Sequence, residues 1–199
     1  MLVITGTGRS FTSVIAQFCT EMGHPTGGHW HNDSNCGCEA FSHLNNAIAE
    51  HVKQNGLVEL EKFRPDIRAI AQPVLKDPRF VVKPGVLETW VAARTDLRFL
   101  ICFRDIESSV KSAQATFHDP ESKVNDFDAH VKDTRRKMAE FLLKVTEMDI
   151  PFAVLHMPKA LTQYARIQQA LTGFGGLLIQ QDAGKRIWDS LYDRSKVHF

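Results

Sequence analysis

The amino-acid sequence predicts a three-layer α/β/α fold with a mostly parallel central sheet. Three observations predict it. Short apolar runs alternate along the chain with longer segments in which apolar residues recur at helical spacing. One run, at residues 98–103, is almost continuously apolar, which is typical of a parallel strand covered on both faces. The run at residues 2–4 is followed by glycines and then by a helical segment, an order typical of parallel sheets with right-handed crossovers.

The first half of the chain is expected to contain two strands. Residues 2–5 form a short apolar run that stops at Gly6, and residues 80–83 form a second run that ends at Pro84 and Gly85. Between and after these strands, apolar residues recur at helical spacing. Helices are therefore expected at residues 13–22, 40–54, 57–75 with a break near Pro65, and 87–94.

The second half continues the alternation of strand and helix. Strands are expected at residues 98–103 and 151–155, and residues 177–180 form either a short strand or a packed loop. Acidic residues open the helix after the first of these strands, as the helix dipole favours, and Pro158 stands where prolines often begin a helix. Helices are expected at residues 105–117, 125–148, from 158 to near 173, and 182–192.

Length and composition restrict the class of protein. A chain of 199 residues that is 43% hydrophobic can bury one good core, so a single domain over residues 1–199 is expected. The net charge of +1 argues against a nucleic-acid partner, which would require a basic face. No apolar run is long enough to span a bilayer and the first strand starts at residue 2, so we expect a cytoplasmic protein without a membrane partner. Cys19 and Cys102 fall on apolar faces as buried thiols.

The segment between the first strand and the first helix predicts a phosphate cradle. Gly6 and Gly8 let the backbone approach a ligand or adopt a positive φ, and Arg9 adds a permanently charged fork of donors. The N–H groups of such a loop and of the helix that follows converge on one anion. The hydroxyl groups that can cap the helix or contact the same anion are those of Ser10, Thr12 and Ser13.

This loop is not a standard Walker A sequence. Phe11 stands where the second glycine of that pattern would be expected, and no lysine follows it. The alternative to a phosphate cradle is an ordinary strand-to-helix turn with a serine cap. A second motif is needed to decide between them.

The long polar loop at residues 23–38 has two interpretations. His29, His31, Cys36 and Cys38 form a His-x-His and Cys-x-Cys set that suggests zinc. Zinc knuckles, however, space their cysteines more widely, and no second pair follows. A polar loop that faces the substrate is the favoured interpretation, and no metal is expected.

The second motif begins at the end of the 98–103 strand. Arg104 lies where ligands bind in an open parallel sheet, beyond the carboxyl end of a strand. Ser112 follows about two helical turns later, so the two side chains can hold one anion together. An anion site here and another at residues 6–13 predict a ligand with two separated phosphates.

These two motifs resemble those of the sulfotransferases that use 3′-phosphoadenosine 5′-phosphosulfate (PAPS). That family has a loop of the form (Gly/Pro)-(Lys/Arg)-Ser-Gly-(Thr/Ser)-(Thr/Ser), and this chain has Gly8-Arg9-Ser10-Phe11-Thr12-Ser13. It also has a strand ending in Arg-(Asp/Asn) with a serine eight residues after the arginine, and this chain has Arg104-Asp105 and Ser112. The resemblance implies a fold like that of the P-loop NTPases and transfer of a sulfuryl group to an acceptor hydroxyl or amine.

The resemblance also implies roles for individual residues. Arg9 would stabilise charge on the oxygen that bridges sulfate and 5′-phosphate, and Arg104 with Ser112 would bind the 3′-phosphate. Ser10, Thr12, Ser13 and the loop amides would hold the 5′-phosphate, without a metal. An acceptor hydroxyl, on a small molecule or a carbohydrate, needs a general base. Glu39 and His31 are the first candidates, ahead of His29 and Glu88.

Two alternatives belong to other functional classes. A small-molecule or nucleotide kinase of the P-loop class would need a lysine at the end of the loop and an aspartate for Mg²⁺, which Asp105 could supply. A non-catalytic nucleotide-binding homologue is the second alternative. It is suggested by Phe11 in place of the loop glycine and by a chain that is short for the family.

Overall fold

The structure, a computed structural model, describes residues 1–26, 39–83, 85–116 and 126–191. At its centre, within these ranges, lies a four-stranded sheet with the order β2-β1-β3-β4, and every neighbouring pair is parallel. The strands are β1 (Leu2–Gly6), β2 (Val74–Lys76), β3 (Arg98–Arg104) and β4 (Phe152–Met157). The predicted α/β fold with a parallel sheet is confirmed.

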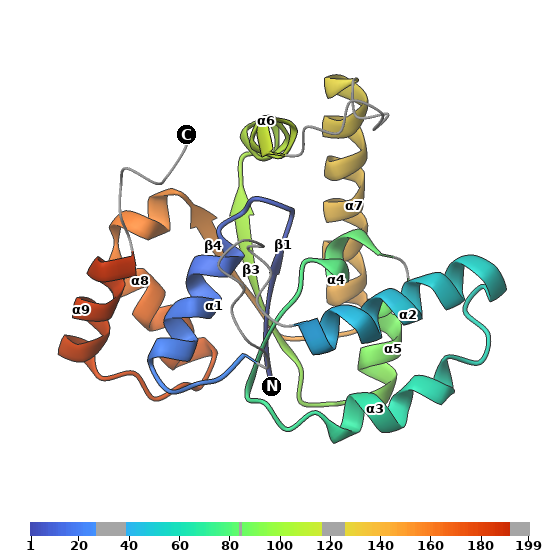
Figure 1. The fold of residues 1–199 in the computed structure, drawn as a ribbon, viewed down its shortest axis with the longest axis horizontal. Helices are drawn as coiled ribbons and strands as arrows, with labels where there is room; N and C mark the ends of the chain where they lie inside the picture. The colour runs from blue at the N-terminus through green and yellow to red at the C-terminus, as the bar shows by residue number, and fades with distance from the viewer. Residues whose placement is uncertain (27–38, 84, 117–125, 192–199) are drawn as a thin grey trace.

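Helices cover both faces of the sheet (Figure 1). One face carries α2 (Glu39–Asn55), the short η1 (Leu60–Phe63), α3 (Arg64–Ala69), α4 (Arg79–Val82), α5 (Val86–Ala93) and α7 (Phe127–Glu147). The other carries α1 (Thr12–Glu21), η2 (Lys159–Thr162), α8 (Tyr164–Gln169), η3 (Ala170–Phe174) and α9 (Gln181–Leu191). Helix α6 (Ile106–Thr116) lies beyond the carboxyl end of β3.

Two apolar clusters, one on each face, hold these layers together. Side chains alternate along a strand, so Phe99 points into one cluster and Leu100 into the other. On the first face, Phe99 makes edge-to-face contacts with Phe80 and Phe141, with ring centroids 5.3 and 5.5 Å apart. On the second face, Phe18 of α1 packs edge-on against Trp188 of α9. Burial on both faces explains why β1 and β3 are almost continuously apolar in sequence.

The strand order identifies one crevice in the sheet. β1 lies between β2 and β3, and the helices that follow β1 and β3 include α1 on one face and α7 on the other. Adjacent strands whose crossovers lie on opposite faces leave a gap at their carboxyl ends, which is where open parallel sheets bind ligands. Both predicted anion-binding motifs begin at this point, directly after β1 and at the end of β3.

The structure corrects two predicted elements in the first half. Residues 80–83 were expected to form a strand, but residues 79–82 form the helical turn α4, and the second strand is β2. A short apolar run fits a strand or a buried helical turn equally well. The Asp77 carboxylate accepts a hydrogen bond from the Arg79 N–H at 2.8 Å, which satisfies a donor at the start of the turn. The helix expected at 57–75 is η1 and α3, and it ends at Ala69.

Most of the other expected elements lie within a few residues of their predicted bounds. The exception is the helix expected from Pro158 to near Gly173, which consists of the successive pieces η2, α8 and η3. Residues 177–180 form a loop in which Leu177 is buried and Leu178 is exposed. The alternative of a packed loop is therefore the correct one.

Candidate functional site

The loop between β1 and α1 is held against the neighbouring strand by the absence of a side chain at Gly6. A Cβ atom at Gly6 would lie 2.3 Å from the backbone oxygen of Cys102 in β3 and 2.5 Å from the Ser10 hydroxyl. Both distances are far shorter than a van der Waals contact, so only glycine allows this close approach. A Cβ atom added at Gly8 would have no atom within 4 Å, and the φ of Gly8 is not positive. Of the two glycines, Gly6 is the one that shapes the loop.

Two residues with full side chains adopt the left-handed conformation that was expected of glycine. Arg9 has a φ of 64° and Phe11 a φ of 63°. Such residues turn the chain sharply, and a backbone that turns in this way can direct its N–H groups toward an anion. For residues other than glycine, this conformation costs on the order of 1–2 kcal/mol each. Strain of this kind is characteristic of functional sites.

Buried hydroxyl groups line the loop. Ser10 is fully buried and Thr7 is 2% exposed, and neither hydroxyl oxygen has a hydrogen-bond partner among the described residues. The N-cap of α1 is Phe11, so Ser10 does not cap the helix, and the N-cap residue makes no side-chain hydrogen bond to it. A buried hydroxyl without a partner costs about 1–3 kcal/mol. An anion seated at the N-terminus of α1 would accept from the helix N–H groups.

Arg104 comes from the end of β3 and contacts the loop directly. Its side chain is buried, and its Nη1 donates to the backbone carbonyl of Arg9 at 3.3 Å. The guanidinium carbon lies 5.2 Å from the centroid of the Phe11 ring, in a cation–π contact. Burial and the nearby positive charge of Arg9 both hold the pKa of Arg104 below its usual range, and Asp105 opposes them. The guanidinium stays charged because its usual pKa is far above neutrality.

Arg9 links the loop to α6. Its Nε donates to the hydroxyl of Ser112 at 3.3 Å. The structure therefore brings Arg9 into contact with Arg104 and with Ser112, each of which lies more than ninety residues further along the chain. Two arginines in such proximity repel each other, and an anion with several charges would relieve that repulsion.

Asp105, the magnesium ligand required by the kinase alternative, already has a structural role. Its carboxylate accepts from the Ser108 N–H at 2.7 Å and so caps the first turn of α6. This hydrogen bond is the main reason why the pKa of Asp105 lies below its usual range.

A buried polar cluster at the end of β2 was not predicted from the sequence. The carboxylate of Asp77 accepts from Asn45 at 2.9 Å and from the Arg79 guanidinium at 3.1 Å. Its backbone carbonyl accepts from the Thr5 hydroxyl at 2.8 Å, and Asn45 in turn accepts from the Trp90 indole at 2.7 Å. This cluster ties β2 to β1 and α2, next to the loop. An aspartate directly after a strand could have indicated this cluster. Asp77 follows β2, but the second strand was expected at residues 80–83.

The candidate general bases are only partly covered by the structure. His31, like His29, Cys36 and Cys38, lies outside the described residues. Glu39 is the first residue of α2, and its side chain is also outside the described part. Across the ranges that the structure describes, no group of three His, Cys, Asp or Glu side chains is arranged to hold a metal ion. Within the same ranges, no helix combines the length and apolar character needed to cross a bilayer.

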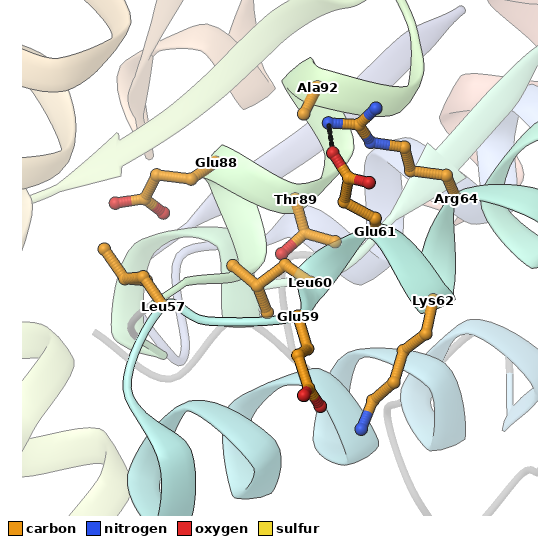
Figure 2. A pocket seen from close by; sticks show the side chains of 9 residues that line it. All are labelled: Leu57, Glu59, Leu60, Glu61, Lys62, Arg64, Glu88, Thr89 and Ala92. Carbon is orange, nitrogen blue, oxygen red and sulfur yellow. Dashed lines mark ion pairs between the residues drawn. The ribbon is translucent and has the colours of Figure 1, made fainter.

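Glu88 belongs to a different part of the molecule. It lines a hollow of about 810 Å³ between η1 and α5 (Figure 2) and forms an ion pair with Lys144. Figure 2 also shows the ion pair between Glu61 and Arg64, 3.1 Å apart. The residues that line the hollow are Leu57, Glu59, Leu60, Glu61, Lys62, Arg64, Glu88, Thr89 and Ala92. None belongs to the loop, and glutamates outnumber cations, so this hollow is not the anion site.

Comparison with known proteins supports the fold assignment. No protein-family model matches the sequence, and no curated protein matches it. Sulfotransferase STF1 of Mycobacterium tuberculosis H37Rv matches the structure with a TM-score of 0.54 and 12% identity, over 95% of this chain and 70% of its own. Sulfotransferase STF9 of Mycobacterium avium matches with a TM-score of 0.55 and 13% identity, over 96% of this chain and 67% of its own. The chain therefore has a sulfotransferase-like fold.

Proposed function

We propose that this chain is a sulfotransferase that moves a sulfuryl group from PAPS to a hydroxyl or amine of a small-molecule or carbohydrate acceptor. The observation that carries the proposal is the contact between the loop after β1 and Arg104 at the end of β3. The positive charges of Arg9 and Arg104 act on each other there, and the loop also holds two buried hydroxyls without partners among the described residues. These groups fit a donor that carries two separated anionic groups on one nucleoside.

Arg9 is the group proposed to act on the transition state. Sulfuryl transfer depends on in-line positioning and charge stabilisation more than on covalent chemistry by the protein. PAPS supplies an activated sulfuryl group, and negative charge grows on the bridging oxygen as the sulfur–oxygen bond breaks. The Arg9 guanidinium, beside the turn at Ser10, provides a fixed positive charge for that oxygen. Thr12 and Ser13 in the first turn of α1, with Gly6, Gly8 and the loop amides, hold the 5′-phosphate.

Arg104 and Ser112 are proposed to bind the 3′-phosphate. A guanidinium offers a planar fork of donors that matches two phosphate oxygens at once. Ser112 already shares a hydrogen bond with Arg9, so one network would connect the two anion sites. This arrangement explains why the donor would need both phosphates for full affinity.

The acceptor side of the reaction is proposed to use Glu39 or His31. A hydroxyl acceptor must lose its proton as it attacks sulfur, and a carboxylate or imidazole can take it. α2 begins at Glu39 and carries Asn45 into the cluster around Asp77, beside β1. No metal ion is required, because the transferred sulfuryl group carries less charge than a phosphoryl group.

Differential stabilisation by nucleotides tests the proposal. The unfolding midpoint and the dissociation constant are measured with 3′,5′-ADP, 5′-AMP and ATP–Mg²⁺. A ligand at one hundred times its dissociation constant stabilises a protein by about 2.7 kcal/mol, or about 5–10 °C for a chain of this size. We expect 3′,5′-ADP to give this shift and 5′-AMP a clearly smaller one, because only 3′,5′-ADP reaches Arg104.

Three outcomes would contradict the sulfotransferase proposal. A larger shift with ATP–Mg²⁺ would favour the kinase, in spite of the missing lysine and the capping role of Asp105. Equal shifts with 3′,5′-ADP and 5′-AMP would mean that Arg104 does not bind a phosphate. Tight binding of 3′,5′-ADP without transfer to any acceptor would support the non-catalytic homologue.

A further inference from the structure

Phe11 stands at a position where glycine would be expected, both from the Walker A pattern and from the conformation of the backbone. It adopts a left-handed backbone, with φ 63° and ψ 16°, as the last residue before α1. Glycine adopts this conformation at no cost, and a bulky residue there is rare. The chain thus keeps an aromatic ring at a position where the backbone favours no side chain at all. A strained backbone at a residue of a binding loop suggests that its side chain has a function there.

The Phe11 ring contacts two different parts of the site. It packs against the apolar cluster that holds α1 to the sheet, and it lies over the guanidinium of Arg104 at 5.2 Å. A ring over the face of a guanidinium attracts it through the π-electrons and uses none of its N–H donors. A carboxylate in the same place would occupy those donors and neutralise the charge. Phe11 therefore holds Arg104 by the face of its guanidinium, in a contact that itself takes up none of the N–H donors.

Such support is needed because Arg104 lies next to another cation. Burial and, after it, the charge of Arg9 lower the pKa of Arg104, so the two like-charged guanidinium groups repel each other. The Arg9 carbonyl holds one edge of the Arg104 guanidinium, at 3.3 Å from Nη1, and the Phe11 ring covers its face. Together these contacts oppose the repulsion and fix the fork before a ligand arrives, which reduces the ordering cost of binding.

We propose that Phe11 is a positioning residue for Arg104 and thereby sets the preference of the site for a nucleotide with a second phosphate. This inference rests on the proposed function. It assigns to the aromatic side chain the role of keeping Arg104 in its binding orientation. The preference for 3′,5′-ADP over 5′-AMP should accordingly depend on the ring and not on the apolar volume of the side chain.

Three variants separate the ring from the backbone and from side-chain volume. Phe11→Leu keeps an apolar side chain and the left-handed backbone but removes the π face. Phe11→Tyr keeps the face. Phe11→Gly relaxes the left-handed backbone but also removes the packing of the ring against the apolar cluster. The unfolding midpoint of each variant shows that it is folded before any binding measurement.

We expect Phe11→Leu and Phe11→Gly to bind 3′,5′-ADP about three- to fivefold more weakly and to bind 5′-AMP unchanged, which is at the lower end of the range for a cation–π contact. Phe11→Tyr should bind both nucleotides as the unchanged chain does. In an Arg104→Ala background, Phe11→Leu should have no further effect, because the group that it orients is gone. Equal losses for both nucleotides, or tighter binding of 3′,5′-ADP by Phe11→Leu or Phe11→Gly, would overturn the proposal.

A second readout does not depend on the nucleotide. Phenylglyoxal modifies arginine side chains, and peptide mass spectrometry gives the rate at Arg104 alone. We expect a faster modification of Arg104 in Phe11→Leu than in Phe11→Tyr, because the ring no longer covers the guanidinium. Equal rates would overturn the positioning role even if the unchanged chain preferred 3′,5′-ADP. The preference of the unchanged chain for 3′,5′-ADP tests the proposed function, and the Phe11 variants test the positioning role. Failure of one proposal can therefore be distinguished from failure of the other.

Discussion

Arg9 and Arg104 carry the same charge at one site, and we expect different consequences when each is removed. Arg104→Ala should weaken 3′,5′-ADP binding about tenfold or more, because a charge-assisted hydrogen bond is worth about 1.5–3 kcal/mol in ground and transition states alike. Arg9→Ala should lower kcat more than it raises the KM of the donor, because charge on the bridging oxygen grows only in the transition state. Steady-state kinetics with saturating donor measures both effects.

Lysine variants are the matched controls for this pair. Arg9→Lys should retain much of the activity, since a point charge can serve the bridging oxygen. Arg104→Lys should retain less, because the planar fork is lost. Lysine and alanine at residue 9 meet the same left-handed backbone as arginine, with its φ of 64°, so neither should relax the loop as glycine would. An Arg9→Ala variant with a raised donor KM and an intact kcat would make Arg9 a ground-state contact and contradict the mechanism.

Among the elements, the strand–loop–helix formed by β1 and α1 depends on one close approach. Gly6→Ala would put a Cβ atom 2.3 Å from the Cys102 carbonyl of β3, so the strands must separate. We expect a loss of about 1–3 kcal/mol in the free energy of unfolding, together with weaker 3′,5′-ADP binding. Gly8→Ala is the control, because nothing lies within 4 Å of its added Cβ and its φ is not positive. It should leave the stability unchanged or raise it by up to about 1 kcal/mol. Equal stability of both variants, measured by denaturant unfolding, would show that the contact is not tight.

On the scale of the whole molecule, two cysteines report on the packing of the sheet. Cys19 of α1 and Cys102 of β3 are both fully buried. Burial raises the pKa of Cys19 to about 12, and it raises the pKa of Cys102 as well. The thiolate is the reactive form, and at pH 8 only about one Cys19 side chain in ten thousand would be ionised.

We therefore expect iodoacetamide to label these two cysteines only when the chain unfolds. The measurement uses a variant with serine at residues 36 and 38, over a denaturant gradient and at fixed reagent concentration. Labelling should follow the loss of the circular-dichroism signal, and 3′,5′-ADP should shift both transitions together. Labelling of either cysteine well below the unfolding transition would show that α1 opens from the sheet on its own.

The alternation of strands and helices, and with it the parallel sheet, could be predicted from the sequence. So could the two segments that build the candidate site, residues 2–13 and 98–112, because each is an apolar run followed by arginine and serine, with glycines as well in the first. Parallel strands align their carboxyl ends, so motifs that follow neighbouring strands must meet. That rule allowed the meeting of Arg9 and Arg104 to be expected without a structure.

What only the tertiary structure decided depends on contacts between residues far apart in the chain. Residues 79–82 became a helical turn, and residues 74–76 the strand, because Asp77 bonds to β1 and to α2. The left-handed backbone of Phe11 and the position of its ring over Arg104 likewise require β3 to lie beside the loop. A local pattern reports the preferences of a segment by itself, whereas these features arise from what the fold packs against it.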